Sequence, residues 1–203
     1  MSNFLRFAVV VLLLASCGGR EQSAPRNLDD ACALSRERPA YFRAMRDTER
    51  RWSVPVPVQM AIIHAESRFD GDARTPHQYA LGVIPLGRQS SAFGYSQALD
   101  GTWEEYQAAT RNRRAERDEI EDATDFIGWY AREAYEQNNI HPTDARNLYL
   151  AYHEGHAGYR RGSYRAPGRQ RRTGTLRSGR VIGSSSCGGC SASSRSMDWP
   201  SAS

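Results

Sequence analysis

Apolar residues in the central part of the chain recur at every third or fourth position, as on the buried face of a helix. The clearest case is residues 119–138, where one face carries Ala123, Ile127, Tyr130 and Ala134. Further helices are predicted over residues 39–52, 58–67, 103–110 and 144–152. No stretch shows the sustained alternation of a strand, so the pattern predicts a mainly α fold.

Flanking residues indicate where these helices begin and end. Asp100 and Thr143 are predicted N-caps, and Gly155 is the predicted stop of the last helix. Residues 71–91 carry several prolines and glycines among scattered apolar residues, which predicts a long loop. Loops of this length in compact domains tend to be functional.

The two ends of the chain differ from this helical part. A positive n-region precedes an unbroken apolar run over residues 7–15, which is too short to span a bilayer. Residues 1–16 are therefore a predicted signal peptide and residues 17–31 a predicted tether. Residues 166–203 are rich in Arg, Gly and Ser, which predicts a disordered tail. The predicted folded domain spans residues 32–165.

The apolar run ends in Leu14-Ala15-Ser16-Cys17, which resembles the lipobox of bacterial lipoproteins. The resemblance implies cleavage before Cys17 and attachment of lipid to it, which would hold the protein on a membrane. Gly18 stands where inner-membrane lipoproteins often have Asp, so the implied address is the outer membrane, facing the periplasm. The alternative is an ordinary secretory signal with an incidental cysteine.

Charge is unevenly distributed along the chain. All 27 basic residues are arginines, and the sequence contains no lysine. After residue 165, six arginines and one aspartate give a net charge of +5, whereas 21 arginines and 22 acidic residues before it give −1. The basic excess belongs to the tail, so it does not indicate that the folded part binds nucleic acid.

Four cysteines are present: Cys17, Cys32, Cys187 and Cys190. With the first of them acylated, three remain available for disulfides in an oxidising compartment. A bridge from Cys32 to either tail cysteine and a local bridge within the tail both remain open. A zinc site formed by His153, His156 and the two tail cysteines is a weaker alternative, because those cysteines lie in a Ser/Gly-rich segment. We expect neither a metal nor a cofactor.

Three short stretches carry candidate chemistry: AESRF at residues 65–69, AFGYSQAL at 92–99 followed by GTW, and YLAYHEG at 149–155. Each alone is an ordinary helix end or turn. In this order they resemble the catalytic domain of soluble-lytic-transglycosylase type in the lysozyme-like superfamily. The signature there is Glu-Ser, then Gly-Leu-Met-Gln near Thr-Trp, then Ala-Tyr-Asn-x-Gly. The resemblance extends to residue 165 and looks closest to a branch of lipoproteins.

The resemblance implies a lysozyme-like helical domain with a long cleft-side loop. It also implies an enzyme that cuts the β-1,4 bond between MurNAc and GlcNAc in peptidoglycan glycan strands without water, leaving 1,6-anhydroMurNAc ends. Glu66 takes the position of the catalytic acid and base. The matched positions around the substrate are Ser67, Gly94, Tyr95, Gln97 and Tyr152.

The matched positions have different implied roles. Ser67 would lie near the sugar N-acetyl group or the reacting centre, and Gly94 and Tyr95 would shape the floor of the cleft. Gln97 would hydrogen-bond the sugar or the catalytic carboxyl. Tyr152 would place its hydroxyl beside that carboxyl.

The residues around Glu66 agree with this role on chemical grounds. Cleavage of a glycosidic bond needs a proton for the leaving oxygen, and a carboxylic acid with a raised pKa supplies one near neutral pH. Glu66 follows an apolar run that includes Met60, Ile62 and Ile63, and such a setting raises the pKa by desolvation. Two alternatives are a muramidase-type hydrolase, which needs a second carboxylate, and a non-catalytic peptidoglycan-binding lipoprotein.

Several positions depart from the family signature. Tyr95 and Ser96 replace Leu-Met in the second stretch, and His153 replaces Asn in the third. Glu154 is a candidate second carboxylate, although a solvated residue beside the helix stop is the preferred interpretation. The loop over residues 71–91 exceeds the usual spacing, which suggests a lid or an extra wall for the substrate. The sequence indicates no particular protein partner.

Overall fold

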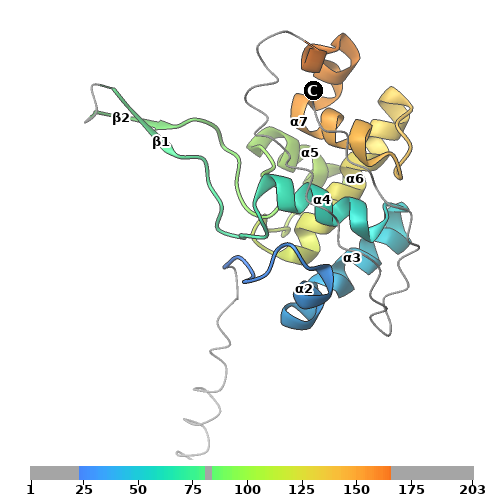
Figure 1. Ribbon diagram of the computed structural model, residues 1–203. Coiled ribbons are helices and arrows are strands. Elements are labelled where there is room, and N and C mark those ends of the chain that lie inside the picture. Colours follow the sequence, from blue (N-terminus) through green and yellow to red (C-terminus); the bar gives the residue numbers. More distant parts are fainter. Residues whose placement is uncertain (1–22, 81–83, 166–203) are drawn as a thin grey trace, which may run out of the picture.

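Six α-helices, one short 3₁₀ helix and one two-stranded sheet make up residues 23–80 and 84–165, the part of the chain that the computed structural model describes (Figure 1). The helices are α2 (Ala31–Glu37), α3 (Pro39–Trp52), α4 (Val56–Glu66), α5 (Asp100–Thr110), α6 (Ile120–Asn138) and α7 (Ala145–Arg161). The strands are β1 (His77–Ala80) and β2 (Ile84–Arg88), and the 3₁₀ helix is η1 (Ser163–Arg165). The predicted mainly helical class is confirmed.

Two predicted helix caps are wrong. Asp100 is the first residue of α5 rather than its cap, and its carboxylate pairs with Arg117 at 2.7 Å. Asp144, not Thr143, caps α7, and its side chain accepts a hydrogen bond from a backbone amide of the first turn at 3.1 Å. An aspartate at this position also favours the positive end of the helix dipole.

Gly155 interrupts α7 where the sequence predicts a helix stop. Its backbone is non-helical, with φ 73° and ψ 156°, and a second helical segment that the prediction lacks follows this kink and runs to Arg161. Glycine adopts this backbone conformation without the steric cost that a side chain would bring. The kink divides α7 into two parts. The first part carries the third of the three sequence stretches, residues 149–155, called the third motif below, and the second part leads to the end of the described residues.

The stretch predicted as a long loop contains a β-hairpin. Its strands pair antiparallel, with an irregularity in register between Gln78 and Tyr79. Strands of four and five residues with an irregular register are too short to leave a clear alternating pattern in the sequence. Figure 1 shows the hairpin as an arm that projects from the helical body. The segment just before the hairpin, which we call its foot, lies next to residues 92–99, called the second motif below, because Arg74 forms an isolated β-bridge with Phe93.

The hydrophobic core is organised around α6, which packs against α3, α4, α5 and α7. The buried positions of α6 include those that the sequence pattern predicts: Ala123, Ile127, Tyr130 and Ala134. Aromatic rings link the helices, since the ring centroid of Phe126 lies 5.2 Å from that of Trp103 in α5 and 6.2 Å from that of Tyr152 in α7. Rings of this size bury large apolar areas, so the cluster fixes α5 and α7 relative to α6.

One carboxylate joins three helices at the edge of this core. Asp125 of α6 accepts hydrogen bonds from Trp52 Nε1 at 2.7 Å and from the Tyr106 hydroxyl at 2.9 Å. It also pairs with Arg51 Nη1 at 3.0 Å. Arg51 and Trp52 end α3, and Tyr106 belongs to α5, so this single group ties both helices to α6.

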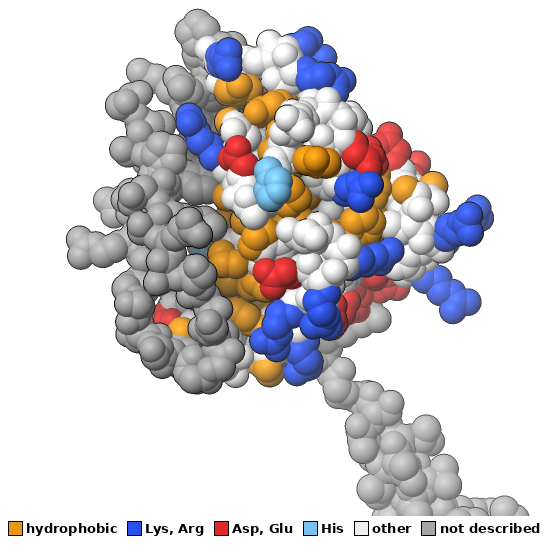
Figure 2. Space-filling model, turned by 90° about the vertical axis from the view of Figure 1, so that its right-hand side faces the viewer, with side chains coloured by type: hydrophobic (Ala, Val, Ile, Leu, Met, Phe, Trp, Pro, Cys, Tyr) orange, Lys and Arg blue, Asp and Glu red, His pale blue; other side chains and the backbone are white. Residues whose placement is uncertain are grey.

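Charged side chains of both signs lie close together on the face that Figure 2 shows. Figure 2 shows arginine and acidic side chains interspersed on one face, with hydrophobic side chains between them. Some form local ion pairs, such as Arg132 with Glu136 one turn later on α6. Over residues 23–80 and 84–165, no helix is long and apolar enough to cross a bilayer.

Several predictions concern residues that lie outside the described ranges. These are the signal peptide, the lipidation site Cys17, the start of the tether, and the tail with Cys187 and Cys190. Cys32, in the first turn of α2, is disulfide-bonded, and its pairing remains open.

We predict that Gly128→Ala destabilises the domain. A Cβ at this position of α6 would lie 2.2 Å from Cδ1 of Trp52, so the indole that reaches Asp125 would have to move. Overpacking of this kind costs about 1–3 kcal/mol in the free energy of unfolding, measurable by urea denaturation. Gly101→Ala in α5 is the matched control, because a Cβ there meets nothing within 4 Å. The control should gain up to about 1 kcal/mol, and equal losses in both variants would contradict the packing argument.

Candidate active site

Glu66 is the last residue of α4, at a point where the chain leaves the helix sharply. Ser67 is the C-cap residue, and Arg68 and Phe69 follow in the left-handed region with φ 54° and 61°. Phe69 is buried and stacks on Tyr41 of α3 with ring centroids 5.9 Å apart. This buried ring anchors the turn, so the carboxyl of Glu66 is held at a fixed helix end.

The carboxyl group of Glu66 is shielded from water on one side. Its Oε1 is buried and has no hydrogen-bond partner among the described residues. Loss of solvation disfavours the charged form, and burial raises the pKa of Glu66 from 4.5 to about 7. No charged neighbour in the described part of the chain contributes to this shift. The site therefore offers a carboxylic acid that keeps its proton near neutral pH.

Ser67 is buried, and its hydroxyl lies within the protein. Its Oγ donates to the carbonyl of Tyr95 at 2.8 Å and also lies 3.2 Å from the carbonyl of Ile63. A hydroxyl has one hydrogen to donate. The hydroxyl of Ser67 therefore fastens the end of α4 to the second motif, and its predicted place near the reacting centre stays a prediction.

Arg117, from the loop between α5 and α6, holds the second motif in place. Gly94 has φ 76°, and a Cβ on it would lie 2.0 Å from the carbonyl oxygen of Arg117. The amide of Tyr95 donates to this same carbonyl at 3.2 Å. The guanidinium of Arg117 donates to the carbonyls of Ser91 and Ala98 at 3.1 and 2.9 Å. Glycine is required for this close approach. Sequence reasoning missed Arg117, because one arginine among many carries no signal.

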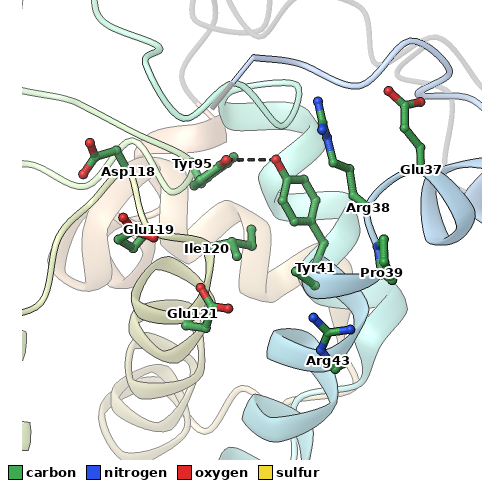
Figure 3. A pocket seen from close by; sticks show the side chains of 11 residues that line it. Glu37, Arg38, Pro39, Tyr41, Arg43, Tyr95, Asp118, Glu119, Ile120 and Glu121 are labelled. Atoms are coloured by element: carbon green, nitrogen blue, oxygen red, sulfur yellow. Dashed lines mark hydrogen bonds between the residues drawn. The ribbon is translucent and has the colours of Figure 1, made fainter. Parts of the chain in front are cut away.

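The side chain of Tyr95 lies in a cavity that Glu66 does not line. Figure 3 shows its hydroxyl meeting that of Tyr41, at a distance of 2.8 Å. The cavity measures about 290 Å³ and lies between the N-terminal ends of α3 and α6, with Arg38 and Glu119 among its lining residues. Tyr95 is 2% exposed. Its ring is therefore not the cleft floor that the resemblance implies, because packing against Tyr41 draws it into this part of the core.

Gln97 turns its amide group back onto the protein. Its backbone has φ 50°, and its Nε2 donates to the carbonyls of Ala73 and Gly94, both at 2.8 Å. Both N–H groups of the amide are thereby used. Through these bonds Gln97 links the second motif to Ala73, just before the hairpin, and a hydrogen bond to a sugar or to Glu66 stays a prediction for its Oε1.

Two tyrosines of α7, Tyr149 and Tyr152, lie close enough to Glu66 for its charge to act on them. Tyr152 donates its hydroxyl hydrogen to the carbonyl of Ser96 at 2.7 Å, which ties α7 to the second motif. Burial and the nearby charge of Glu66 raise the pKa of Tyr152, and the same two causes raise the pKa of Tyr149 to about 12. Sequence reasoning assigned no role to Tyr149. Its spacing of three residues before Tyr152, which puts both on one helix face, was the available signal.

Glu154 is buried, and the preferred interpretation as a solvated residue is wrong. Its side chain is 5% exposed, its Oε1 lies 3.3 Å from His153 Nδ1, and its Oε2 accepts a hydrogen bond from the Ser163 hydroxyl at 2.5 Å. Gly158 makes room for this contact, since a Cβ there would lie 3.0 Å from Ser163 Oγ. Because α7 continues past Gly155, Glu154 faces η1 instead of solvent.

Among residues 23–80 and 84–165, no three or more side chains are grouped so that they could hold a metal ion. His156, one of the four candidate zinc ligands, stacks on Tyr130 with ring centroids 4.1 Å apart. Burial lowers the pKa of His156. Cys187 and Cys190 lie outside the described residues, so the zinc alternative rests on the sequence alone.

The sequence matches the family model described as Transglycosylase SLT domain over residues 5–175. The match includes α4 with Glu66, the second motif and α7. The chain therefore belongs to the transglycosylase SLT domain family, which confirms the resemblance drawn from the three motifs. Proteins with this domain act on peptidoglycan, so the chain is a peptidoglycan-acting enzyme of the cell envelope. No curated protein matches the chain.

We predict that Glu66→Gln stabilises the folded chain at pH 8 but not at pH 4. Below pH 4.5 the carboxyl is protonated in both the folded and the unfolded state, so its burial carries no ionisation penalty. Between pH 4.5 and about 7 the unfolded state loses the proton that the folded state keeps, and the free energy of unfolding falls. Glutamine removes this penalty, which is about 1–3 kcal/mol once it is complete above pH 7. Urea denaturation at the two pH values measures the gain, and an equal gain at both would contradict the raised pKa.

Proposed function

We propose that this protein is a lytic transglycosylase that cleaves the MurNAc–GlcNAc β-1,4 bond without water and leaves 1,6-anhydroMurNAc ends. The observation that carries the proposal is a single carboxyl, that of Glu66, whose pKa burial raises to about 7. A hydrolase of the paired-carboxylate type holds its two groups about 5–10 Å apart. A second carboxylate so close would itself raise the pKa of Glu66, and none in the described part does so.

One carboxyl group is enough for the proposed reaction because it acts twice. Protonated Glu66 first donates its proton to the glycosidic oxygen, the C1–O bond breaks, and GlcNAc leaves with a free hydroxyl. The MurNAc ring is left with positive charge at C1, beside the carboxylate just formed. That carboxylate then takes the proton from the C6 hydroxyl of the same sugar, and O6 closes on C1. Glu66 ends protonated, as it began, and no water is consumed.

The other matched residues support this reaction through the backbone. Ser67, Gly94, Gln97 and Tyr152 are proposed to keep the segment of residues 93–98 at a fixed distance from Glu66 through the hydrogen bonds described above. Catalytic side chains need such support, because small displacements of a proton donor cost much of the rate.

The location of the enzyme is proposed from the sequence. Lipid on Cys17 would hold the protein at the outer membrane, facing the periplasm, with residues 17–31 as the tether to a domain over residues 32–165. Peptidoglycan lies within reach of such an anchor. Residues 166–203 are proposed to form a separate, basic tail.

The full-length chain, purified in detergent, should release 1,6-anhydromuropeptides from isolated peptidoglycan, because attack by the C6 hydroxyl excludes water from the product. Mass spectrometry of the digest separates these ends from ordinary reducing ends, which are heavier by one water. A digest that contains only reducing ends would identify a muramidase instead. Binding to peptidoglycan with no released fragments would identify a non-catalytic lipoprotein.

Glu66→Gln should abolish cleavage, since an amide can neither give nor take the proton in either step. We expect a loss of at least about 10²–10⁴-fold in rate, the usual contribution of a general acid–base group. Sedimentation with peptidoglycan should be unchanged. Glu104→Gln, at an exposed position of α5, is the matched control and should keep full activity. Normal turnover by the Glu66→Gln chain would contradict the proposed mechanism.

A further inference from the structure

Two aromatic rings on one face of α7 extend the site beyond Glu66. Tyr149 and His153 are four residues apart, which places them on adjacent turns of the same helix face. Their ring centroids are 6.2 Å apart, with the planes inclined by 47°. Tyr149 is partly buried against the core, whereas the side chain of His153 is 42% exposed. The pair thus forms a wall that runs from the protein interior towards solvent.

Hydrogen bonds place this wall next to the catalytic carboxyl. Ser67, which follows Glu66, bonds the second motif, and Tyr152 of α7 bonds the adjacent carbonyl of the same motif. The face of α7 that carries Tyr152 is therefore joined to the end of α4, and the two helices are in contact. Tyr149 lies one turn before Tyr152, close enough for the charge of Glu66 to act on it.

The ring of His153 is oriented by a buried carboxylate. Glu154 Oε1 lies 3.3 Å from His153 Nδ1, and Glu154 is itself held by the hydroxyl of Ser163. A carboxylate accepts hydrogen bonds, so this contact favours the tautomer with hydrogen on Nδ1 and a lone pair on Nε2. The contact engages Nδ1 and leaves Nε2 as the nitrogen that can accept a hydrogen bond from a ligand. Nε2 is an acceptor of fixed direction beside the tyrosine ring.

We propose that Tyr149 and His153 form a subsite that holds one sugar ring of the glycan strand beside Glu66. The Tyr149 ring packs against the apolar C–H face of the pyranose, as aromatic side chains do in binding sites of mixed polarity. His153 Nε2 accepts a hydrogen bond from a hydroxyl or N-acetyl N–H of the bound strand. This inference rests on the proposed function, since it assigns a sugar as the ligand. It also gives a reason for a histidine where the family signature has Asn.

Binding of soluble, peptide-free glycan strands to the full-length Glu66→Gln chain tests the subsite without interference from turnover. Tyr149→Leu and His153→Ala, each added to that chain, should raise the Kd by about fivefold or more, equivalent to the loss of one good contact. Tyr149→Phe keeps the ring and should recover most of the affinity lost in Tyr149→Leu. Tyr135→Leu is the matched control, because Tyr135 is 47% exposed on α6 and lies outside the subsite; its Kd should not change.

A kinetic measurement separates binding from a structural effect. In the chain that retains Glu66, His153→Ala should raise KM more than it lowers kcat, and its thermal unfolding midpoint should stay that of the parent. Because the side chain of His153 is exposed, His153→Ala should fold normally, and its kinetics test the subsite even if Tyr149→Leu fails to fold. Unchanged Kd in both Tyr149→Leu and His153→Ala would overturn the subsite while leaving cleavage by the parent intact. Failure of the parent chain to cleave peptidoglycan would instead remove the proposed function, and the subsite with it.

Discussion

The proposed chemistry of this domain depends on keeping the carboxyl group of Glu66 partly out of water and away from positive charge. An arginine beside Glu66 would lower its pKa and remove the proton that a leaving glycosidic oxygen needs. The sequence contains 27 arginines, yet none in the described part shifts the pKa of Glu66. The group instead lies at the end of an apolar helix, with one oxygen buried and unpaired. Ionisation there is unfavourable, so the feature that makes the group useful also reduces stability above neutral pH.

Most polar side chains around Glu66 bind the protein's own backbone. Ser67, Gln97 and Tyr152 each donate to carbonyls in or beside residues 93–98, and Arg117 donates to two more. One irregular segment is thereby held from four directions. Such a segment has no helix or sheet to satisfy its backbone groups, so side chains must do so. The hydrogen bond from Ser67 also joins this segment to the residue that follows Glu66, so the segment is held close to the Glu66 carboxyl.

The site is assembled on α6 although α6 supplies none of its side chains. Both α4 and α7 pack against α6, and their relative position decides how close Tyr149 and Tyr152 come to Glu66. Asp125 and the absence of a side chain at Gly128 set the approach of α3 to the same helix. The packing of the core therefore positions the end of α4, the first part of α7 and residues 93–98, which together form the candidate site.

The helical class followed from the sequence because helix periodicity is a local property, visible wherever one face is buried. Glu66 became the candidate acid because its motif resembles the Glu-Ser of the family signature, and the apolar run before it predicts the desolvation that the structure shows. Only the tertiary structure decided where the surrounding side chains point. Tyr95, Ser67 and Gln97 share the motif's spacing, but packing against Tyr41 and the unsatisfied carbonyls of a loop turn all three into the protein. Tyr149, Glu154 and Arg117 gained roles only when the continuation of α7 and the fold of the loops brought distant residues together. Sequence spacing determines what lies on one helix face; contacts between elements far apart in the chain depend on the packing of the whole domain.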